Sequence, residues 1–232
     1  MEPEVNSELY VPDVVPDEDR AYYENEERYG NRVGWGEEPA VLVVDMTCAF
    51  TGEVPAVGDP CIEANERLIT AAREAGVPVF YAKPNPAGTY PEGYPKTTKA
   101  SPTSTRGPAD VEPTGDHSAW REDLDRIEPA LDPREDEAVV TKSRASAFFD
   151  THLGSLLRYH GVDTLVVGGM TTSCCIRATV VDSHSSNFRT IVPEECVADP
   201  SKISHEVGLF DMDTKFADVT PLSDVVDELA NR

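Results

Sequence analysis

The sequence is poor in basic residues, in long apolar runs and in regularly spaced cysteines. No apolar run approaches the ~18 residues that a membrane-spanning helix needs, and no basic-then-apolar signal stands near residue 1. We therefore expect a soluble, cytoplasmic protein without a membrane partner. Lys and Arg number 20 against 43 Asp and Glu, which leaves a net charge of −23. Because such a surface repels phosphate backbones, no nucleic-acid partner is expected either.

The acidity is spread along a chain that also has periodic apolar segments, and this favours a folded, halophilic protein. Concentrated salt screens the surface repulsion, and the net charge keeps the protein soluble. An ordinary acidic protein with an acidic tail is the alternative. The cysteines have no disulfide-scaffold spacing and are interpreted as reduced thiols: Cys48, Cys61, Cys174, Cys175 and Cys196.

Apolar strand patterns alternate with helical patterns along most of the chain. Strands are predicted at residues 40–45, 77–82, 137–141, 164–167, 189–192 and 217–220. Helices are predicted at residues 61–75, 120–127, 151–160, 175–186, 201–216 and 223–230, the first with Asp59 as N-cap and Pro60 in its first turn. The alternation predicts an α/β, three-layer Rossmann-like fold, with a six-stranded parallel sheet covered by helices on both faces.

Two segments depart from this alternation. Residues 1–38 combine acidic clusters with prolines and aromatic residues. We expect an N-terminal arm that packs on the body, residues 39–232, or on a neighbouring subunit. Residues 83–113 are rich in Pro, Gly, Thr and Ser and have no periodicity. A loop of that length in a compact domain is usually a functional lid or an oligomer contact.

A cysteine pair stands between a predicted strand and a predicted helix. The apolar run Thr164–Val167 is broken by Gly168-Gly169, and Cys174-Cys175 opens the next helical pattern. The first turn of a helix presents unpaired N–H groups and the positive end of the helix dipole, and both favour a thiolate nucleophile. Two small hydrophobic residues filling a tight turn are the alternative, and the cysteines alone do not decide.

Three predicted strands are followed by groups of complementary chemistry, Asp45, Lys142 and Cys175. Because the carboxyl ends of parallel strands lie along one edge of the sheet, the three groups should converge there. A carboxylate can take the thiol proton and return it to a leaving amine, while an ammonium stabilises both negative charges. Asp45 and Lys142 alone could form a structural ion pair, but the addition of Cys175 favours a catalytic site.

Three motifs resemble the isochorismatase-like superfamily of cysteine hydrolases, whose signature is an Asp–Lys–Cys triad. The motifs are Val43–Met46, Thr141–Phe149 and Gly168–Thr179, and the similarity extends over roughly residues 35–225. Within the superfamily, the run Thr171–Thr179 and the segment His205–Val219 most resemble the N-carbamoylsarcosine amidase branch. The resemblance implies a homo-oligomer, a dimer or a tetramer.

The resemblance also implies a reaction and the residues that carry it. The chain would be a cysteine-dependent amidohydrolase that cleaves a C–N bond of a small carbamoyl or amide substrate through a thiol-acyl intermediate and releases ammonia. Cys175 would be the nucleophile, because the residue before it, here Cys174, is commonly glycine in this branch. The family's cis peptide would join Met170 to Thr171, and the N–H groups of Thr171 and Cys175 would form the oxyanion hole.

The chain departs from related patterns at two places. Nicotinamidases of the superfamily hold a metal with an Asp-x-His and a further His after the second strand, whereas residues 83–117 contain only His117. No catalytic metal or other cofactor is therefore expected. Related amidases often carry Asp-Arg after the fifth strand, where this chain has Asp199-Pro200. Arg144 and Arg177 remain as candidates to bind a substrate carboxylate, or as structural ion-pair formers.

Two other functions are compatible with the same fold. Isochorismatase-type hydrolysis of a vinyl ether would proceed without the thiol. A non-catalytic scaffold or binding module would keep the fold around a relic site. The presence of all three triad residues argues against the non-catalytic alternative.

Overall fold

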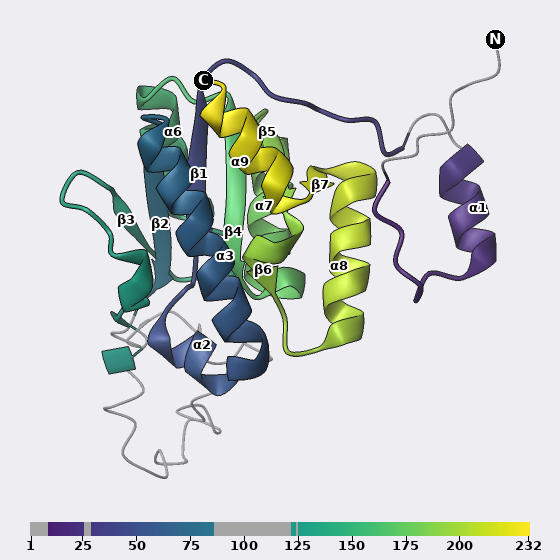
Figure 1. Ribbon diagram of the computed structural model, residues 1–232, viewed down its shortest axis with the longest axis horizontal. Helices are drawn as coiled ribbons and strands as arrows, with labels where there is room; N and C mark the ends of the chain where they lie inside the picture. The colour runs from purple at the N-terminus through teal and green to yellow at the C-terminus, as the bar shows by residue number, and fades with distance from the viewer. Residues whose placement is uncertain (1–8, 26–28, 86–121, 124) are drawn as a thin grey trace.

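The computed structural model describes residues 9–25, 29–85, 122–123 and 125–232 (Figure 1). Its strands are β1 (Pro39–Val44), β2 (Val79–Pro84), β3 (Val139–Lys142), β4 (Thr164–Met170), β5 (Arg189–Pro193), β6 (Val197–Ala198) and β7 (Asp218–Thr220). They form one parallel sheet in the order β3-β2-β1-β4-β5-β7, with β6 paired to β4. The predicted α/β fold is confirmed, and the short strand β6 is an addition to the six strands expected.

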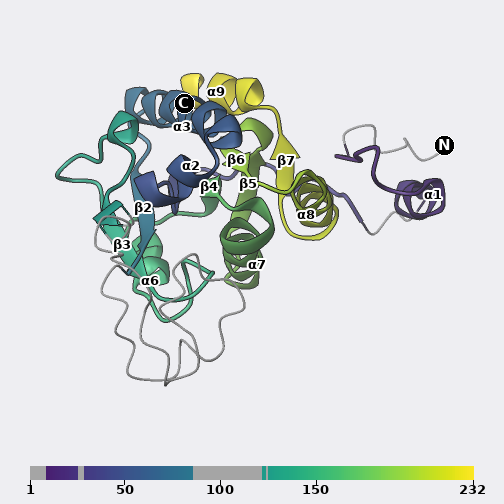
Figure 2. The same cartoon turned by 90° about the horizontal axis from the view of Figure 1, so that it is seen from below.

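Helices cover both faces of the sheet. They are α1 (Asp17–Asn25), α2 (Cys48–Glu53), α3 (Pro55–Glu74), α6 (Leu153–Tyr159), α7 (Arg177–Ser185), α8 (Lys202–Lys215) and α9 (Leu222–Ala230). Short turns are η1 (Pro129–Leu131) and η3 (Glu194–Cys196), both 3₁₀-helical, and η2 (Thr172–Ile176), which is π-helical. Figure 2 shows α3 and α9 on one face of the sheet and α6, α7 and α8 on the other, which gives the three layers.

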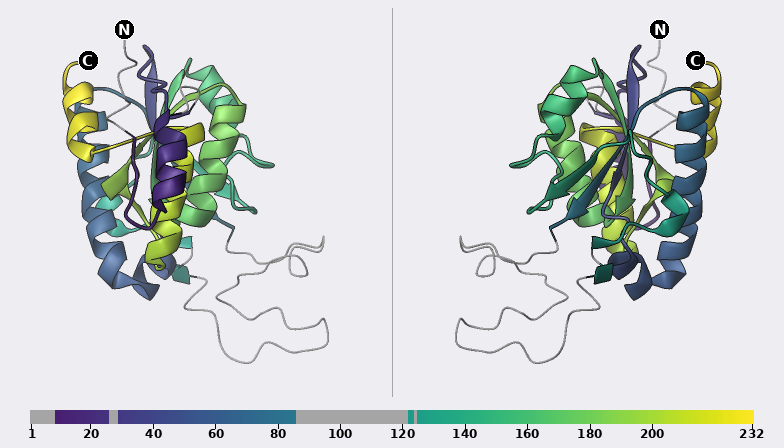
Figure 3. Two further views of the ribbon diagram at one scale, coloured as in Figure 1. Left: turned by 90° about the vertical axis from the view of Figure 1, so that its right-hand side faces the viewer. Right: turned by 90° about the vertical axis from the view of Figure 1, so that its left-hand side faces the viewer.

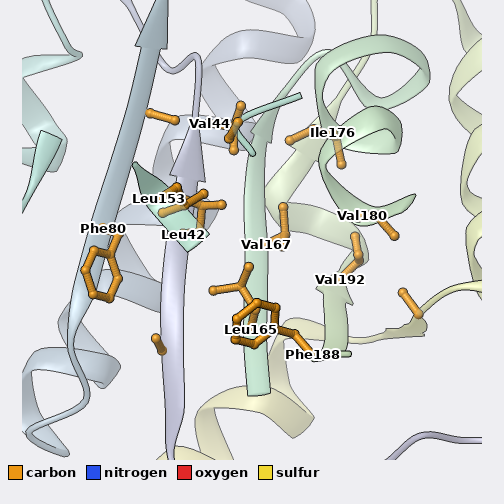
Figure 4. Packing of buried hydrophobic residues seen from close by; sticks show 14 of the residues in the cluster. Leu42, Val44, Phe80, Leu153, Leu165, Val167, Ile176, Val180, Phe188 and Val192 are labelled. Atoms are coloured by element: carbon orange, nitrogen blue, oxygen red, sulfur yellow. The ribbon is translucent and has the colours of Figure 1, made fainter. Parts of the chain in front are cut away.

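Successive side chains of each central strand point to opposite faces of the sheet and pack in two separate core layers. Leu42 and Val167 pack in the same layer as Leu153 of α6 (Figure 4). Tyr81 packs in the opposite layer, with α3 and α9. Every residue of β1 is buried. A strand that is buried on both faces has no polar alternation, and this explains the continuous apolar run that ends at Val44.

The long helix α3 starts earlier than predicted. It begins at Pro55 rather than after Asp59, so Pro60 lies inside the helix. Pro55 can open the helix because the first turn has no intrahelical use for the N–H group that proline lacks. The end of the helix is as predicted, with Gly76 following at φ 71°.

The described part of the N-terminal arm packs on its own chain, alongside α8 (Figure 3). The Tyr23 ring of α1 meets Phe210 of α8 edge-on, with ring centroids 5.0 Å apart. Arg32 Nη1 lies 2.7 Å from Asp213 Oδ1. The sequence predicts that the arm packs on the body of its own chain or on a neighbouring subunit, and in this structure it packs on the body of its own chain.

Several expectations fall on residues outside the described ranges. They are most of the 83–113 loop, His117, and residues 120, 121 and 124 of the helix predicted at 120–127. The division between arm and domain after residue 38 also stays a prediction, although β1 begins at Pro39. Within the described residues, no helix is both long enough and apolar enough to cross a membrane.

Candidate active site

The order of the strands reverses between β1 and β4. β2 and β3 continue the sheet beyond β1, whereas β5 and β7 continue it beyond β4. In parallel sheets the carboxyl ends of the strands at such a switch point form the usual binding crevice. Asp45 directly follows β1, Lys142 ends β3, and Cys175 lies in the turn after β4. The structure therefore brings the three predicted residues to one place.

Lys142 is at the centre of this cluster. Its Nζ lies 2.6 Å from Asp45 Oδ2 and 3.5 Å from Cys175 Sγ. It also donates a hydrogen bond to the carbonyl oxygen of Arg144 at 3.1 Å. The Lys142 and Asp45 side chains are only 4% and 1% exposed, so their interaction is screened little by water. The ammonium can thus stabilise negative charge on the carboxylate or on the sulfur.

A left-handed backbone conformation directs Asp45 out of β1. Its φ is 56°, in a region that aspartate adopts more readily than most residues. The Asp45 N–H still donates to the carbonyl of Ala82 at 2.8 Å, which fixes the residue to the sheet. Among the described residues, neither carboxylate oxygen of Asp45 has a partner in hydrogen-bond geometry. The carboxylate therefore keeps acceptor capacity for a proton.

Two glycines allow β4 to approach its neighbours closely at this edge. Gly169 has φ 122°, and a Cβ there would lie 1.9 Å from the carbonyl oxygen of Val44. A Cβ on Gly168 would lie 2.2 Å from Asn65 Oδ1. A side chain at either position is sterically excluded without movement of the backbone or of Asn65. The close approach of β4 to β1 places the following turn beside Asp45.

The helix predicted from residue 175 is wrong at its start. Residues Thr172–Ile176 form the π-helical turn η2, and α7 begins at Arg177. The physical reason is that the Thr171 carbonyl accepts the N–H of Ile176, five residues on, at 3.2 Å. Such wide turns occur frequently at functional sites. The candidate nucleophile is therefore held in a wide turn and not in the first turn of a regular helix.

The two adjacent cysteines have different surroundings. Cys175 is half-buried and faces Lys142, whereas Cys174 is exposed. A hydrogen bond with the Cys175 thiol lowers the pKa of Cys174 to about 7. The peptide bond between Met170 and Thr171 is cis, which is the position that the family resemblance implies.

Burial and charge set the protonation of the triad. Burial raises the pKa of Asp45 above the usual range of aspartate, against the opposing charge of Lys142. Burial alone would lower the pKa of Lys142, but the negative charges of Asp45 and Cys175 outweigh it and raise that pKa. The hydrogen bond to Cys174, burial and the charge of Asp45 raise the pKa of Cys175. The resting site thus holds an ammonium beside a protonated thiol and an aspartate whose pKa is raised.

The two candidate arginines lie in different settings. Arg144 contributes the carbonyl oxygen that accepts from Lys142. Arg177 contacts Asp211 of α8 through Nη2 and through Nε, the latter at 2.8 Å. Lys215 pairs with the same carboxylate. Arg177 is therefore engaged in an ion-pair network on α8, while Arg144 adjoins the triad.

No group of three or more His, Cys, Asp or Glu side chains is placed to hold a metal ion in the part of the chain that the structure describes. His117 lies outside that part. The expectation that no catalytic metal is present remains an expectation.

Two residues that the sequence pattern did not assign to the site contact the η2 turn. Asp199 Oδ2 accepts from the N–H of Ser173 at 3.1 Å and from its hydroxyl at 2.6 Å. His205 Nδ1 lies 2.8 Å from Thr172 Oγ1. The sequence did hold a signal for Asp199, since this acid directly follows a short apolar pair, the residues of β6.

Comparison with known proteins identifies the family of the chain and several relatives. Residues 39–224 match the model of the isochorismatase domain family. The chain is 34% identical over 210 residues to the maleamate amidohydrolase of Pseudomonas putida, with 87% of this chain and 91% of that protein covered. It is 36% identical over 217 residues to an N-carbamoylsarcosine amidase of an Arthrobacter species, with 88% and 76% covered.

Among solved structures, the N-carbamoylsarcosine amidase of Thermoplasma acidophilum is similar with a TM-score of 0.58 and 25% identity. The match covers 80% of this chain and 97% of that one. With the family match over residues 39–224 and an Arthrobacter relative at 36% identity, the chain belongs to the isochorismatase domain family.

Proposed function

We propose that the protein is a cysteine-dependent amidohydrolase that releases ammonia from a small carboxylic acid bearing a terminal amide or carbamoyl group. The observation that carries the proposal is the contact of Lys142 Nζ with both Asp45 and Cys175. The relatives support the substrate class, because two of them are named for maleamate and N-carbamoylsarcosine. Both compounds join a carboxylate to an H₂N–C=O group.

In the proposed first half-reaction, Cys175 Sγ attacks the carbonyl carbon while Asp45 takes the thiol proton. The raised pKa of Asp45 makes it a stronger base than an ordinary aspartate. Asp45 then gives the proton to the departing nitrogen, which leaves as ammonia. An S-acyl or S-carbamoyl cysteine remains on the enzyme.

In the second half-reaction, Asp45 takes a proton from water, and the resulting hydroxide attacks the carbonyl carbon of the intermediate. The C–S bond breaks, and the proton returns to Cys175. Lys142 stays protonated throughout, since its pKa is raised, and it stabilises charge on the sulfur and the carboxylate.

The N–H groups of Thr171 and Cys175 are proposed to hold the oxyanion of the tetrahedral intermediate. The arrangement of η2 supports this choice. The amides on either side of Cys175, those of Cys174 and Ile176, both donate to the Thr171 carbonyl, at 3.1 and 3.2 Å. These two amides are therefore occupied and cannot serve the oxyanion.

Arg144 is proposed to bind the substrate carboxylate. Its carbonyl oxygen accepts a hydrogen bond from Lys142 Nζ, which places its main chain beside the reacting centre, and its Nη1 donates to the carbonyl of Ser143 at 3.0 Å. Arg177, the other arginine considered, is already paired with Asp211. Arg144→Gln should lower kcat/KM for a carboxylate substrate by about 10- to 100-fold and leave kcat/KM for neutral amides unchanged. Arg177→Gln is the matched control and should leave KM for the carboxylate substrate unchanged. A loss of kcat/KM in Arg177→Gln but not in Arg144→Gln would assign carboxylate binding to Arg177 instead.

The test of the function is ammonia release from N-carbamoylsarcosine, maleamate and neutral primary amides, measured from low to multimolar KCl. Cys175→Ala should lower turnover by roughly four orders of magnitude or more. Cys174→Ala, the matched control, should keep turnover, because small residues suit that position. Mass spectrometry should find the acyl group on Cys175 in quenched reactions.

Other outcomes would change the assignment. Unchanged ammonia release by Cys175→Ala would contradict the proposal. Release from neutral amides alone would remove the carboxylate from the substrate class. Thiol-independent turnover of isochorismate, with no amide hydrolysis, would instead indicate vinyl-ether hydrolysis.

A further inference from the structure

We propose that Asp199 and His205 are positioning residues that hold the η2 turn so that Cys175 Sγ faces Lys142 and Asp45. The inference rests on the proposed function only for the identity of the nucleophile. It assigns a role to a buried carboxylate and a histidine that lie outside the triad.

Asp199 ties the turn to two other elements. The residue is 7% exposed and directly follows β6, which pairs with β4 in the sheet. Its Oδ2 accepts both the N–H and the hydroxyl of Ser173, at 3.1 and 2.6 Å. Its Oδ1 accepts the N–H of Ser201, at the start of α8, at 3.0 Å. A single buried carboxylate thus joins the sheet, the turn and α8.

His205 makes a second tie from α8 to the same turn. Its Nδ1 lies 2.8 Å from the hydroxyl of Thr172, which is fully buried. Burial lowers the pKa of His205, so the ring is neutral at pH 7. The helix also lies beside the turn here, since a Cβ on Gly208 would be in ordinary van der Waals contact with Thr172 Cγ2, at 3.5 Å, and with the Cα of Ser173, at 3.6 Å.

These contacts place the turn between α8 and the triad. Thr172 and Ser173 are held from the α8 side, while Cys175 Sγ lies 3.5 Å from Lys142 Nζ on the other. A nucleophile displaced by about 1 Å can lose on the order of a hundredfold in rate. Loss of either tie should therefore reduce the reactivity of Cys175 and not only the stability of the fold.

The experiment compares variants that remove each tie with variants that keep it. Thr172→Val removes the hydroxyl at constant shape, and Thr172→Ser keeps it. His205→Ala removes the Nδ1 contact, whereas His205→Asn places an amide near the Nδ1 position. Asp199→Ala and Ser173→Ala remove the second tie. All are made in a Cys174→Ala background, because the exposed Cys174 thiol, with its pKa of about 7, would otherwise compete.

The readout is the rate of Cys175 alkylation by iodoacetamide as a function of pH, followed by mass spectrometry. Thr172→Val, His205→Ala and Asp199→Ala should shift the pH profile and lower the alkylation rate. They should also lower kcat by about 10- to 100-fold with little change in KM. Thr172→Ser and His205→Asn should recover most of both values.

Two variants control for simple loss of stability in α8. Ser201→Ala removes a side chain that accepts from the N–H of Ser204 at 3.3 Å. Asp213→Asn alters a buried carboxylate near the other end of the helix. Both should lower the midpoint of thermal unfolding and leave the alkylation profile unchanged. If Asp199→Ala does not fold, the comparison of Thr172→Val with Thr172→Ser tests the positioning role by itself. An alkylation profile shifted in Thr172→Val and restored in Thr172→Ser would support that role, and wild-type profiles in both would overturn it.

Alkylation needs no substrate, so this test is independent of the proposed function. Wild-type alkylation profiles and kcat in Asp199→Ala and His205→Ala would overturn the positioning role, even if ammonia release depends on the thiol. A shifted profile in a protein that hydrolyses no amide would support the positioning role and contradict the amidohydrolase.

Discussion

Asp45 and Asp213 are both buried carboxylates, and they differ in what surrounds them. They are 1% and 4% exposed, and burial raises the pKa of each. Asp213 lies where the N-terminal arm meets α8 and β7. Its oxygens accept three hydrogen bonds of 2.7 Å, from the N–H of Tyr10, the guanidinium of Arg32 and the N–H of Val219.

Asp45 has a different environment at the carboxyl edge of the sheet. It pairs with Lys142, and in the described part of the chain neither of its oxygens has a partner in hydrogen-bond geometry. A carboxylate with its acceptors occupied by fixed donors ties segments together. One that faces only a cation and a thiol retains the capacity to exchange a proton. Burial alone therefore does not mark a reactive acid; the number of fixed donors does.

The largest expected effect separates the two acids by activity. Asp45→Asn should lower kcat for the proposed hydrolysis by about 10²- to 10⁴-fold, because it removes the group that moves the proton. Asp213→Asn should keep kcat per folded molecule. Steady-state assays normalised to folded protein by circular dichroism would measure both. Similar losses of kcat in the two variants would break the comparison.

The next effect concerns the cation. Lys142→Met should reduce the free energy of unfolding by about 3–5 kcal/mol at pH 7, because Asp45 is left as an uncompensated buried charge. Without Lys142, the folded-state pKa of Asp45 lies further above its unfolded value. A group with a raised folded-state pKa lowers the free energy of unfolding as pH rises from its unfolded to its folded pKa. The destabilisation caused by Lys142→Met should therefore be smaller at low pH. Urea unfolding at pH 7 and pH 5 would measure it, and the Asp45→Asn, Lys142→Met double variant should be more stable than Lys142→Met at pH 7.

A smaller effect is expected at the arm. Asp213→Asn should reduce the free energy of unfolding by about 1–3 kcal/mol, because an amide has one oxygen for donors that now use two. Urea unfolding followed by circular dichroism is the measurement. Arg32→Gln removes the other member of this ion pair. It should reduce the free energy of unfolding by less than Asp213→Asn, since the Arg32 side chain is more exposed than that of Asp213. No change in either variant would show that the arm does not depend on this carboxylate.

The smallest effect is expected at a partly exposed acid on α8. Burial would raise the pKa of Asp211, but Lys215 and Arg177 outweigh it and lower that pKa. A lowered folded-state pKa stabilises above the unfolded pKa, and the contribution is lost as pH falls through the folded pKa. Asp211→Asn should therefore cost under about 1 kcal/mol at pH 7 and less in high salt. A cost equal to that of Asp213→Asn would contradict the distinction between exposed and buried acids.

The sequence predicted the fold where one physical signal dominated. A strand buried on both faces must be apolar throughout, so β1 and β4 were visible as runs. Elements that depend on other parts of the chain were less visible. β6 has only two residues and exists because Gly169 and Met170 of β4 offer partners to Val197 and Ala198. The start of α3 at Pro55 likewise depends on where α2 ends.

By itself, the sequence determined the parallel α/β fold and the triad candidates. The reason is that a buried strand and the group that follows it form a short local sequence pattern, and a parallel sheet brings the carboxyl ends of such strands together. Only the tertiary structure decided the wide η2 turn, the pairing of Arg177 with Asp211, and the contacts of Asp199 and His205 with that turn. These features depend on the placement of α8 against the nucleophile segment, a long-range packing that no local pattern encodes.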